Sequence, residues 1–79
     1  MRATVLVRPK EGILDPQGEA VLGALRHLEF TVDDVRIGRV IDIELDAEDA
    51  ETARAEVGRM CEQLLANPLI ESFEIEVSA

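Results

Sequence analysis

The chain has 79 residues, a formal net charge of -9 and no tryptophan or tyrosine. A chain of this length is expected to form a single domain, residues 1–79, and buries only about 60% of the surface that its unfolded form exposes, so its hydrophobic core is thin. The negative charge and the lack of aromatic rings argue against a nucleic-acid partner, because phosphates are repelled and bases find few rings on which to stack.

Residues 2–9 form the first predicted element, a strand of alternating apolar residues. One face of this strand carries Ala3, Val5 and Val7. A helix follows from about Pro16 to Leu28. Asp15 can accept hydrogen bonds from the N–H groups of its first turn, and Pro16 sits at the first helical position, where no N–H is needed. The apolar stripe of this helix is expected to lie on a sheet and consists of Val21, Ala24, Leu25 and Leu28.

Two glycines lie within this predicted helix, Gly18 and Gly23. A glycine inside a helix costs about 1 kcal/mol of stability relative to alanine. Because glycine has no Cβ, we interpret Gly18 as a position where another chain approaches the first turn. Gly23 is expected to pack closely against a neighbour.

Residues 32–45 form a long β-favouring segment whose polarity pattern changes at Gly38. Val35 and Ile37 share a face before the glycine, and apolar residues alternate with acidic ones after it. Two interpretations remain open. Gly38 and Arg39 form a hairpin turn, which gives the βαββαβ order of a ferredoxin-like fold, or they bend one long middle strand. We prefer the bent strand, because no second turn-forming residue accompanies Gly38.

The second helix is predicted from about Glu48 to Ala66, opened by Asp46 with Asp49 in a capping arrangement. Its apolar stripe consists of Ala53, Val57, Met60, Cys61 and Leu64. A last strand follows with three inward residues, Phe73, Ile75 and Val77. The predicted fold is α+β, in the order β-α-β-α-β, with a mostly antiparallel sheet and two helices covering one face.

Residues that could carry catalysis are few. His27 and Cys61 could form a nucleophilic pair, but Cys61 falls on the buried stripe of its helix, so we expect no catalytic residue. A single cysteine allows no internal disulfide and fits a reducing cytoplasm. No apolar run approaches the roughly 20 residues that span a bilayer. We therefore expect no bound metal or cofactor and no membrane contact.

Three stretches together resemble a known family: LDPQG at residues 14–18, DVRIGR at residues 34–39 and MCEQLLANPLIE at residues 60–71. In this order and spacing they are similar to PurS, the small subunit of phosphoribosylformylglycinamidine synthase. The resemblance covers essentially the whole chain. It identifies the chain as a member of that family.

The resemblance implies a place in the fourth step of de novo purine synthesis, where ammonia from glutamine and ATP convert formylglycinamide ribonucleotide to its amidine. In this family PurL carries the synthetase chemistry and PurQ the glutaminase chemistry, so ATP and Mg belong to the complex. PurS bridges the two subunits, aids ammonia transfer and forms dimers. The resemblance assigns no catalytic residue to this subunit.

Two stretches are candidate surfaces for contact with other chains, the predicted helix start and the bend in the middle strand. The residues are Asp15, Pro16, Gln17, Gly18, Arg36, Gly38 and Arg39. Arginine is favoured at interfaces because its planar fork pairs carboxylates, so Arg36→Glu or Arg39→Glu is expected to weaken assembly without unfolding the domain. The middle strand is also a candidate to pair with its copy in a homodimer. The rival hypothesis is a free-standing dimeric module that regulates or binds a metabolite.

Overall fold

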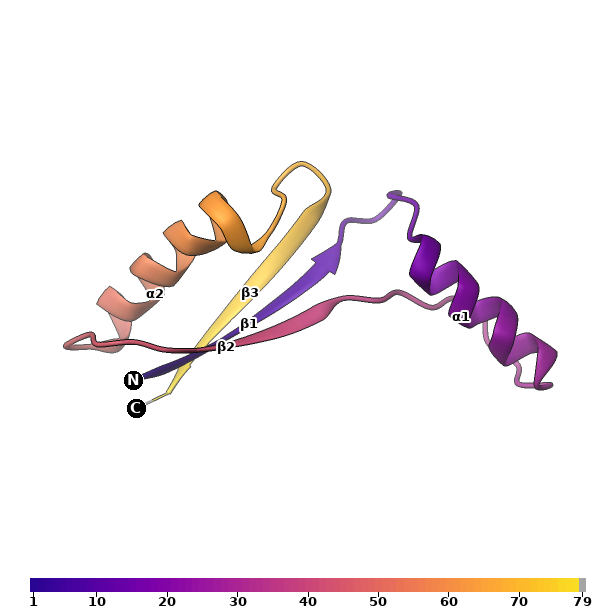
Figure 1. Cartoon of the computed structure of the whole chain (residues 1–79), viewed down its shortest axis with the longest axis horizontal. Coiled ribbons are helices and arrows are strands. Elements are labelled where there is room, and N and C mark those ends of the chain that lie inside the picture. Colours follow the sequence, from indigo (N-terminus) through magenta and orange to yellow (C-terminus); the bar gives the residue numbers. More distant parts are fainter. Residues whose placement is uncertain (79) are drawn as a thin grey trace.

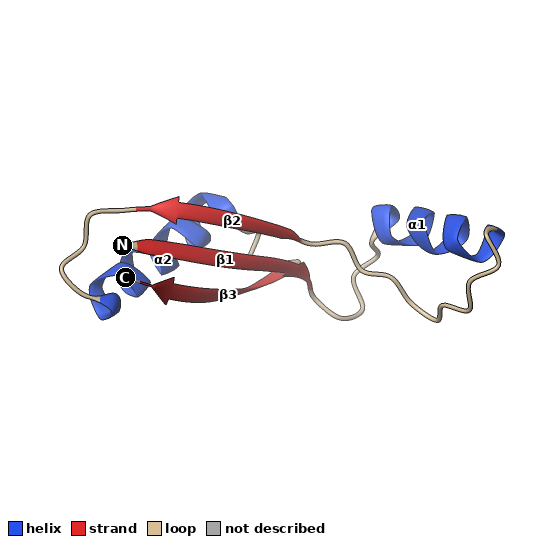
Figure 2. Cartoon of the chain, turned by 90° about the horizontal axis from the view of Figure 1, so that it is seen from below, coloured by secondary structure: helices blue, strands red, loops and turns tan. Residues whose placement is uncertain are grey.

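The computed structural model describes residues 1–78, which form an elongated molecule with extents of 50 × 25 × 14 Å (Figure 1). Its elements are β1 (Arg2–Pro9), α1 (Pro16–His27), β2 (Arg39–Glu44), α2 (Ala50–Met60), the π-helical turn η1 (Cys61–Leu65) and β3 (Glu71–Ser78). A sheet and α2 occupy one end, and α1 occupies the other (Figure 2). The α+β class and the predicted element order are confirmed.

The sheet is antiparallel throughout, in the order β2-β1-β3. At its centre Val5 lies opposite Ile41 on one side and Ile75 on the other. Because β1 has a neighbour on each side, the inward residues of β1 are the best buried of the sheet. The alternation predicted for β1 and β3 is confirmed: the buried core consists of Ala3, Val5, Val7, Val57, Cys61 and Ala66, with Phe73, Ile75 and Val77 packed against it.

The second helix follows its predicted stripe for two turns and then departs from it. Ala53, Val57 and Cys61 are buried, but Met60, also predicted for the stripe, is 36% exposed. Leu64 is 83% exposed. The cause is the π-helical turn, in which the Ala66 N–H donates to the Cys61 carbonyl at 3.0 Å and widens the spacing by one residue. Leu65, instead of Leu64, packs against the core.

The cap of this helix also differs from the prediction. Asp49, and not Asp46, is the N-cap residue, and its carboxylate accepts a hydrogen bond of 2.7 Å from the Thr52 N–H. The helix therefore begins at Ala50, two residues later than expected. Either aspartate could cap a helix from the sequence alone, because an N-cap side chain accepts from the N–H two or three residues later and aspartate is favoured at that position.

The long middle strand is shorter than predicted. β2 begins at Arg39, directly after Gly38, and residues 35–38 belong to no strand. A Cβ at Gly38 would lie less than 3.0 Å from the Val7 carbonyl oxygen, so the chain crosses close to β1 here and leaves the sheet. Within residues 1–78 the sheet has three strands, so the alternative four-stranded ferredoxin-like order is wrong.

The prediction that both helices cover one face of the sheet is wrong, because only α2 does so. α2 packs on β3 and β1, whereas α1 has no substantial packing on any strand in the described part of the chain (Figure 1). The expected stripe of α1 remains open to solvent, with Val21 38% and Leu28 65% exposed. The side of α1 that is buried carries Gly18 and Leu22. An apolar stripe predicts that a helix face will be covered, but not by which surface.

Candidate partner interface at the neck of the molecule

Two connecting segments, residues 10–15 and 35–38, join the sheet to α1 and run past each other between them (Figure 2). We call these two segments the neck. The seven residues predicted as an interface all lie in the neck or adjoin it: Asp15, Pro16, Gln17, Gly18, Arg36, Gly38 and Arg39. The structure thus brings together two stretches that the sequence marked separately.

Asp15 connects the two segments of the neck. Its Oδ1 atom accepts a hydrogen bond of 3.0 Å from the Gly18 N–H, which caps α1. Its Oδ2 atom accepts a hydrogen bond of 2.7 Å from the Ile37 N–H. Ile37 belongs to residues 35–38, which lead back to the sheet and are called the returning segment below. These bonds, first that from Ile37 and then that from Gly18, hold the pKa of the Asp15 carboxyl below its ordinary value. The group is therefore ionised at neutral pH and serves both segments.

Gly18 owes its identity to the same close approach. It is buried, and a Cβ at this position would lie less than 3.0 Å from the backbone carbonyl oxygen of Val35 and from Asp15 Oδ2. The backbone that approaches the first turn of α1 is thus the returning segment of the same chain. A glycine is required here for the neck to close, whether or not a second chain also contacts it.

The side chains of Arg36 and Arg39 donate hydrogen bonds to other residues of the same chain. The Arg36 guanidinium donates to the Pro9 carbonyl oxygen and so spans the neck. Arg39 forms a bidentate ion pair with Glu71, with Nη1 to Oε2 at 2.8 Å and Nη2 to Oε1 at 3.1 Å, and also donates to the Leu65 carbonyl at 2.7 Å. Arg39 therefore ties the start of β2 to the end of η1 and the start of β3.

Glu71 is the acceptor at the centre of that network. Its Oε1 atom also accepts a hydrogen bond of 2.7 Å from the Asn67 N–H. The hydrogen bonds from Arg39 and from Asn67 lower the pKa of the Glu71 carboxyl below its ordinary value. Only 18% of the Glu71 side chain is exposed, against 49% of Arg39. This ion pair is the least exposed one in residues 1–78.

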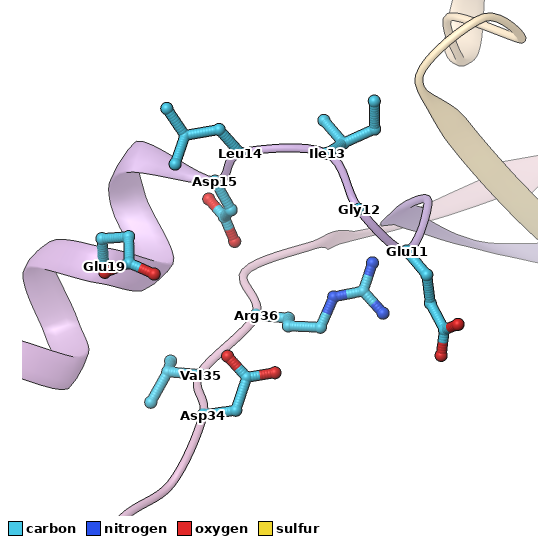
Figure 3. Close-up of a pocket in the computed structure, with 9 residues that line it drawn as sticks. All are labelled: Glu11, Gly12, Ile13, Leu14, Asp15, Glu19, Asp34, Val35 and Arg36. Carbon is cyan, nitrogen blue, oxygen red and sulfur yellow. The ribbon is translucent and has the colours of Figure 1, made fainter.

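The neck is hollowed on two sides. An open cavity of about 510 Å³ lies between the loop before α1 and the returning segment, where the Arg36 guanidinium faces the Glu11 loop and the carboxylates of Glu19 and Asp34 lie along the rim (Figure 3). A second cavity, of about 410 Å³, is lined by both segments of the neck and by the start of β3. Its apolar lining consists of Pro9, Ile13, Leu14, Pro16, Ile37 and Ile70. Both hollows thus combine charged and apolar residues, and the second is also lined by Asp15, Arg39 and Glu71.

Several exposed apolar residues in the loops at the two ends of α1 and before β3 escaped the sequence analysis. Leu14 is 77%, Phe30 59% and Leu69 82% exposed. All three lie in loops, outside any helical or strand periodicity. A large apolar residue in a loop without such a pattern is itself the signal that could have marked them, because loops are otherwise polar and solvated.

Groups that could carry chemistry are not brought together. Cys61 is buried where α2 passes into η1, and His27 is the last residue of α1, which lies at the other end of the molecule from α2 (Figure 1). Burial raises the pKa of the Cys61 thiol, which disfavours the reactive thiolate. In residues 1–78 there is no group of three or more His, Cys, Asp or Glu side chains suited to hold a metal ion. No helix in that range is long and apolar enough to cross a membrane.

Comparison with known proteins identifies the family. A model of the PurS family, described as phosphoribosylformylglycinamidine (FGAM) synthase, matches residues 2–79. The PurS subunit of this synthase from Archaeoglobus fulgidus is 46% identical over 76 residues, which are 95% of this chain and 95% of the relative. The structure of Bacillus subtilis PurS has a TM-score of 0.88 at 40% identity and covers 99% of this chain and 98% of that one.

A further solved structure is that of PurLQS from Thermotoga maritima. One of its chains has a TM-score of 0.86 at 33% identity and covers 95% of this chain and 93% of that one. The fold is similar to these structures over nearly the full length of the chain. From these matches in sequence and structure, the chain belongs to the PurS family of phosphoribosylformylglycinamidine synthase subunits.

Proposed function

We propose that this chain is the non-catalytic assembly subunit of FGAM synthase, which bridges a PurL synthetase and a PurQ glutaminase and aids the transfer of ammonia between them. The PurLQS structure from Thermotoga maritima, with its similar chain, supports PurL and PurQ as the partners. ATP and Mg act at the synthetase, and this chain binds no cofactor of its own. It works in the cytoplasm, where purine precursors are made.

The observation that carries this proposal is the exposed apolar surface of α1 and its flanks. Scattered exposed apolar residues are ordinary, but a segment that presents many of them marks an interaction surface. Residues 13–30 expose five large ones: Ile13, Leu14, Val21, Leu28 and Phe30. Because α1 has no substantial packing on a strand or on the other helix in the described chain, its exposed stripe is available to other chains.

Reconstitution with PurL and PurQ from the same organism tests the assembly function. We expect glutamine-dependent FGAM formation to fall at least about tenfold when this chain is omitted, because the ammonia source is then no longer held at the synthetase. Activity with free ammonium should change much less, since PurL carries the synthetase chemistry. Full glutamine-dependent activity without this chain would contradict the proposal and favour the free-standing module instead.

Self-association is the second part of the proposal. β2 is an edge strand, and its inward residues Ile41 and Ile43 are only half-buried. A second copy of the chain would cover these residues or the open stripe of α1, and so add to a thin core. We therefore propose a homodimer in which α1 contributes to the interface.

Val21→Glu tests the part that α1 takes in the dimer. Val21 is 38% exposed, so glutamate at this position should leave the monomer folded but raise the dimer dissociation constant at least about tenfold by burying a charge. The exposed Ala55 on α2 supplies the control, Ala55→Glu, which should leave the constant unchanged. Analytical ultracentrifugation measures both. An unchanged constant in Val21→Glu, or a wild-type monomer at micromolar concentration, would contradict the interface.

A further inference from the structure

Each of the two α-helices has an aspartate as its N-cap residue, but the two carboxylates accept different hydrogen bonds. Asp49 accepts the Thr52 N–H of its own helix at 2.7 Å. Asp15 accepts the Gly18 N–H of its own helix on one oxygen and the Ile37 N–H of the returning segment on the other. The second bond spans 22 positions of the chain and reaches the segment that leads into β2.

We infer that the Asp15 carboxylate is a latch that fixes the direction of α1 relative to the sheet. α1 has no substantial packing on the sheet, so its direction is set by contacts in the neck (Figure 1). Asp15 supplies the contact that joins the first turn of α1 to the returning segment, beside the close approach of Gly18 to Val35. The Arg36 hydrogen bond to the Pro9 carbonyl spans the neck but does not reach α1.

The latch requires a carboxylate because two separate oxygen atoms are in use. A carboxylate offers an acceptor on each oxygen, whereas a side-chain amide offers one oxygen and a donor group in place of the other. Asparagine caps helices as well as aspartate does. Asp15→Asn can therefore keep the bond from Gly18 while losing the bond from Ile37, which separates the cap from the latch.

The charges around Asp15 keep the latch closed at neutral pH. Arg36 lies on the same side of the neck and favours the charged carboxylate, while Glu19, Asp34 and Glu11 line the adjoining cavity and Arg39 and Glu71 line the second one. Protonation of Asp15 would leave one acceptor, as asparagine does. Since the folded pKa is lowered, the bond from Ile37 persists above the ordinary aspartate range and is lost only as the pH falls through that lowered value.

A fixed α1 has a consequence for binding, which rests on the function proposed above. Partner subunits then meet a preformed surface and need not order α1 as they bind. A loosened α1 would have to be ordered at that moment, which weakens affinity even though the exposed apolar residues of α1 are unchanged. Asp15 is in this sense a positioning residue for assembly.

Amide hydrogen exchange of the full chain, read by NMR, tests the latch directly. In Asp15→Asn the Ile37 amide should exchange at least about tenfold faster, while the Gly18 amide changes little. The matched control Asp49→Asn removes the same charge from the other cap and should leave Ile37 unchanged. In the wild-type protein the Ile37 amide proton resonance should also shift as Asp15 titrates in acid, which needs no variant. The latch hypothesis would be wrong if the Ile37 amide exchanged as slowly in Asp15→Asn as in the wild type. It would also be wrong if the Ile37 amide proton resonance did not shift in acid.

The same variant tests the consequence for assembly. Asp15→Asn should require roughly tenfold more of this chain to restore glutamine-dependent activity to PurL and PurQ. If the Ile37 amide exchanges faster in Asp15→Asn but the same amount of this chain restores activity, the latch is supported and its role in assembly is wrong. If the proposed function itself is wrong, PurL and PurQ will show full glutamine-dependent activity without this chain.

Discussion

Gly18→Ala is expected to lower the free energy of unfolding by up to about 2 kcal/mol, although alanine is the better helix former. The new methyl group would lie less than 3.0 Å from the Val35 carbonyl oxygen and from Asp15 Oδ2, so the returning segment must move away from α1. Overpacking of this kind costs about 1–3 kcal/mol, against about 1 kcal/mol gained in helix propensity. Urea unfolding followed by circular dichroism measures the difference.

The chain supplies a matched control in the same helix. Gly23 has no atom within 4 Å of the position of a Cβ, so the close packing expected there is absent from the chain itself. Gly23→Ala should therefore stabilise the protein by about 0.5–1 kcal/mol. Equal stabilisation by both substitutions would show that the returning segment does not press on Gly18 in solution. The sequence interpretation of Gly18 as a position where another chain approaches the first turn would then stand.

The features that were predictable from the sequence are those with a local physical cause. Alternation in β1 and β3 identified the inward residues, because neighbouring strand residues point to opposite faces. The start of α1 was predictable because an aspartate before a proline satisfies the first-turn N–H groups by local geometry alone. Such signals lie within a few residues and need no knowledge of the rest of the fold.

The features that were missed depend on contacts between distant segments. Leu64 fits the stripe of α2 in sequence, but the π-helical turn rotates it into solvent. The stripe of α1 was read as a surface for the sheet, yet the neck carries the helix away from it. Gly38 marked a real change of direction, but the pattern could not tell a bent strand from a chain that leaves the sheet beside Val7.

In the candidate interface, too, the local features were predictable and the contact between distant segments was not. Its two stretches were recognised separately, by a well-capped helix start and by arginines flanking a glycine. Their meeting in the neck depends on Asp15 reaching the Ile37 N–H, a contact for which no periodicity exists. The residues thus have structural roles within the chain in addition to the interface role that we propose for them.

Arg39→Glu is expected to destabilise the fold itself by about 2 kcal/mol, and not only to weaken assembly as the sequence suggested. The substitution removes the donor to the Leu65 carbonyl and places a second carboxylate against Glu71, which is largely buried. Hydrogen bonds to charged groups contribute about 1.5–3 kcal/mol, and solvent at the half-exposed guanidinium reduces that figure. Urea unfolding at neutral pH measures the loss.

The fall in the free energy of unfolding at acidic pH gives a second measurement of the Arg39–Glu71 ion pair. Because the folded pKa of Glu71 is lowered, the pair stabilises the protein above the ordinary glutamate range, and that contribution is lost as the pH falls through the lowered value. The free energy of unfolding of Arg39→Glu should therefore fall less between neutral and acidic pH than that of the wild type, because the variant already lacks the Arg39–Glu71 ion pair that acid disrupts. The comparison needs only unfolding curves at several pH values.

Arg2→Glu is the matched control, because Arg2 pairs with Glu44 across two strands with 57% and 69% of the side chains exposed. An exposed pair of this kind contributes about 0–1 kcal/mol, so the same reversal of charge should cost less than half as much as at Arg39. Equal losses at the two positions would mean that the Glu71 network behaves as an ordinary surface pair. If both losses are also small, so that the fold stays intact, weakened assembly in Arg39→Glu can be assigned to a lost contact with a partner.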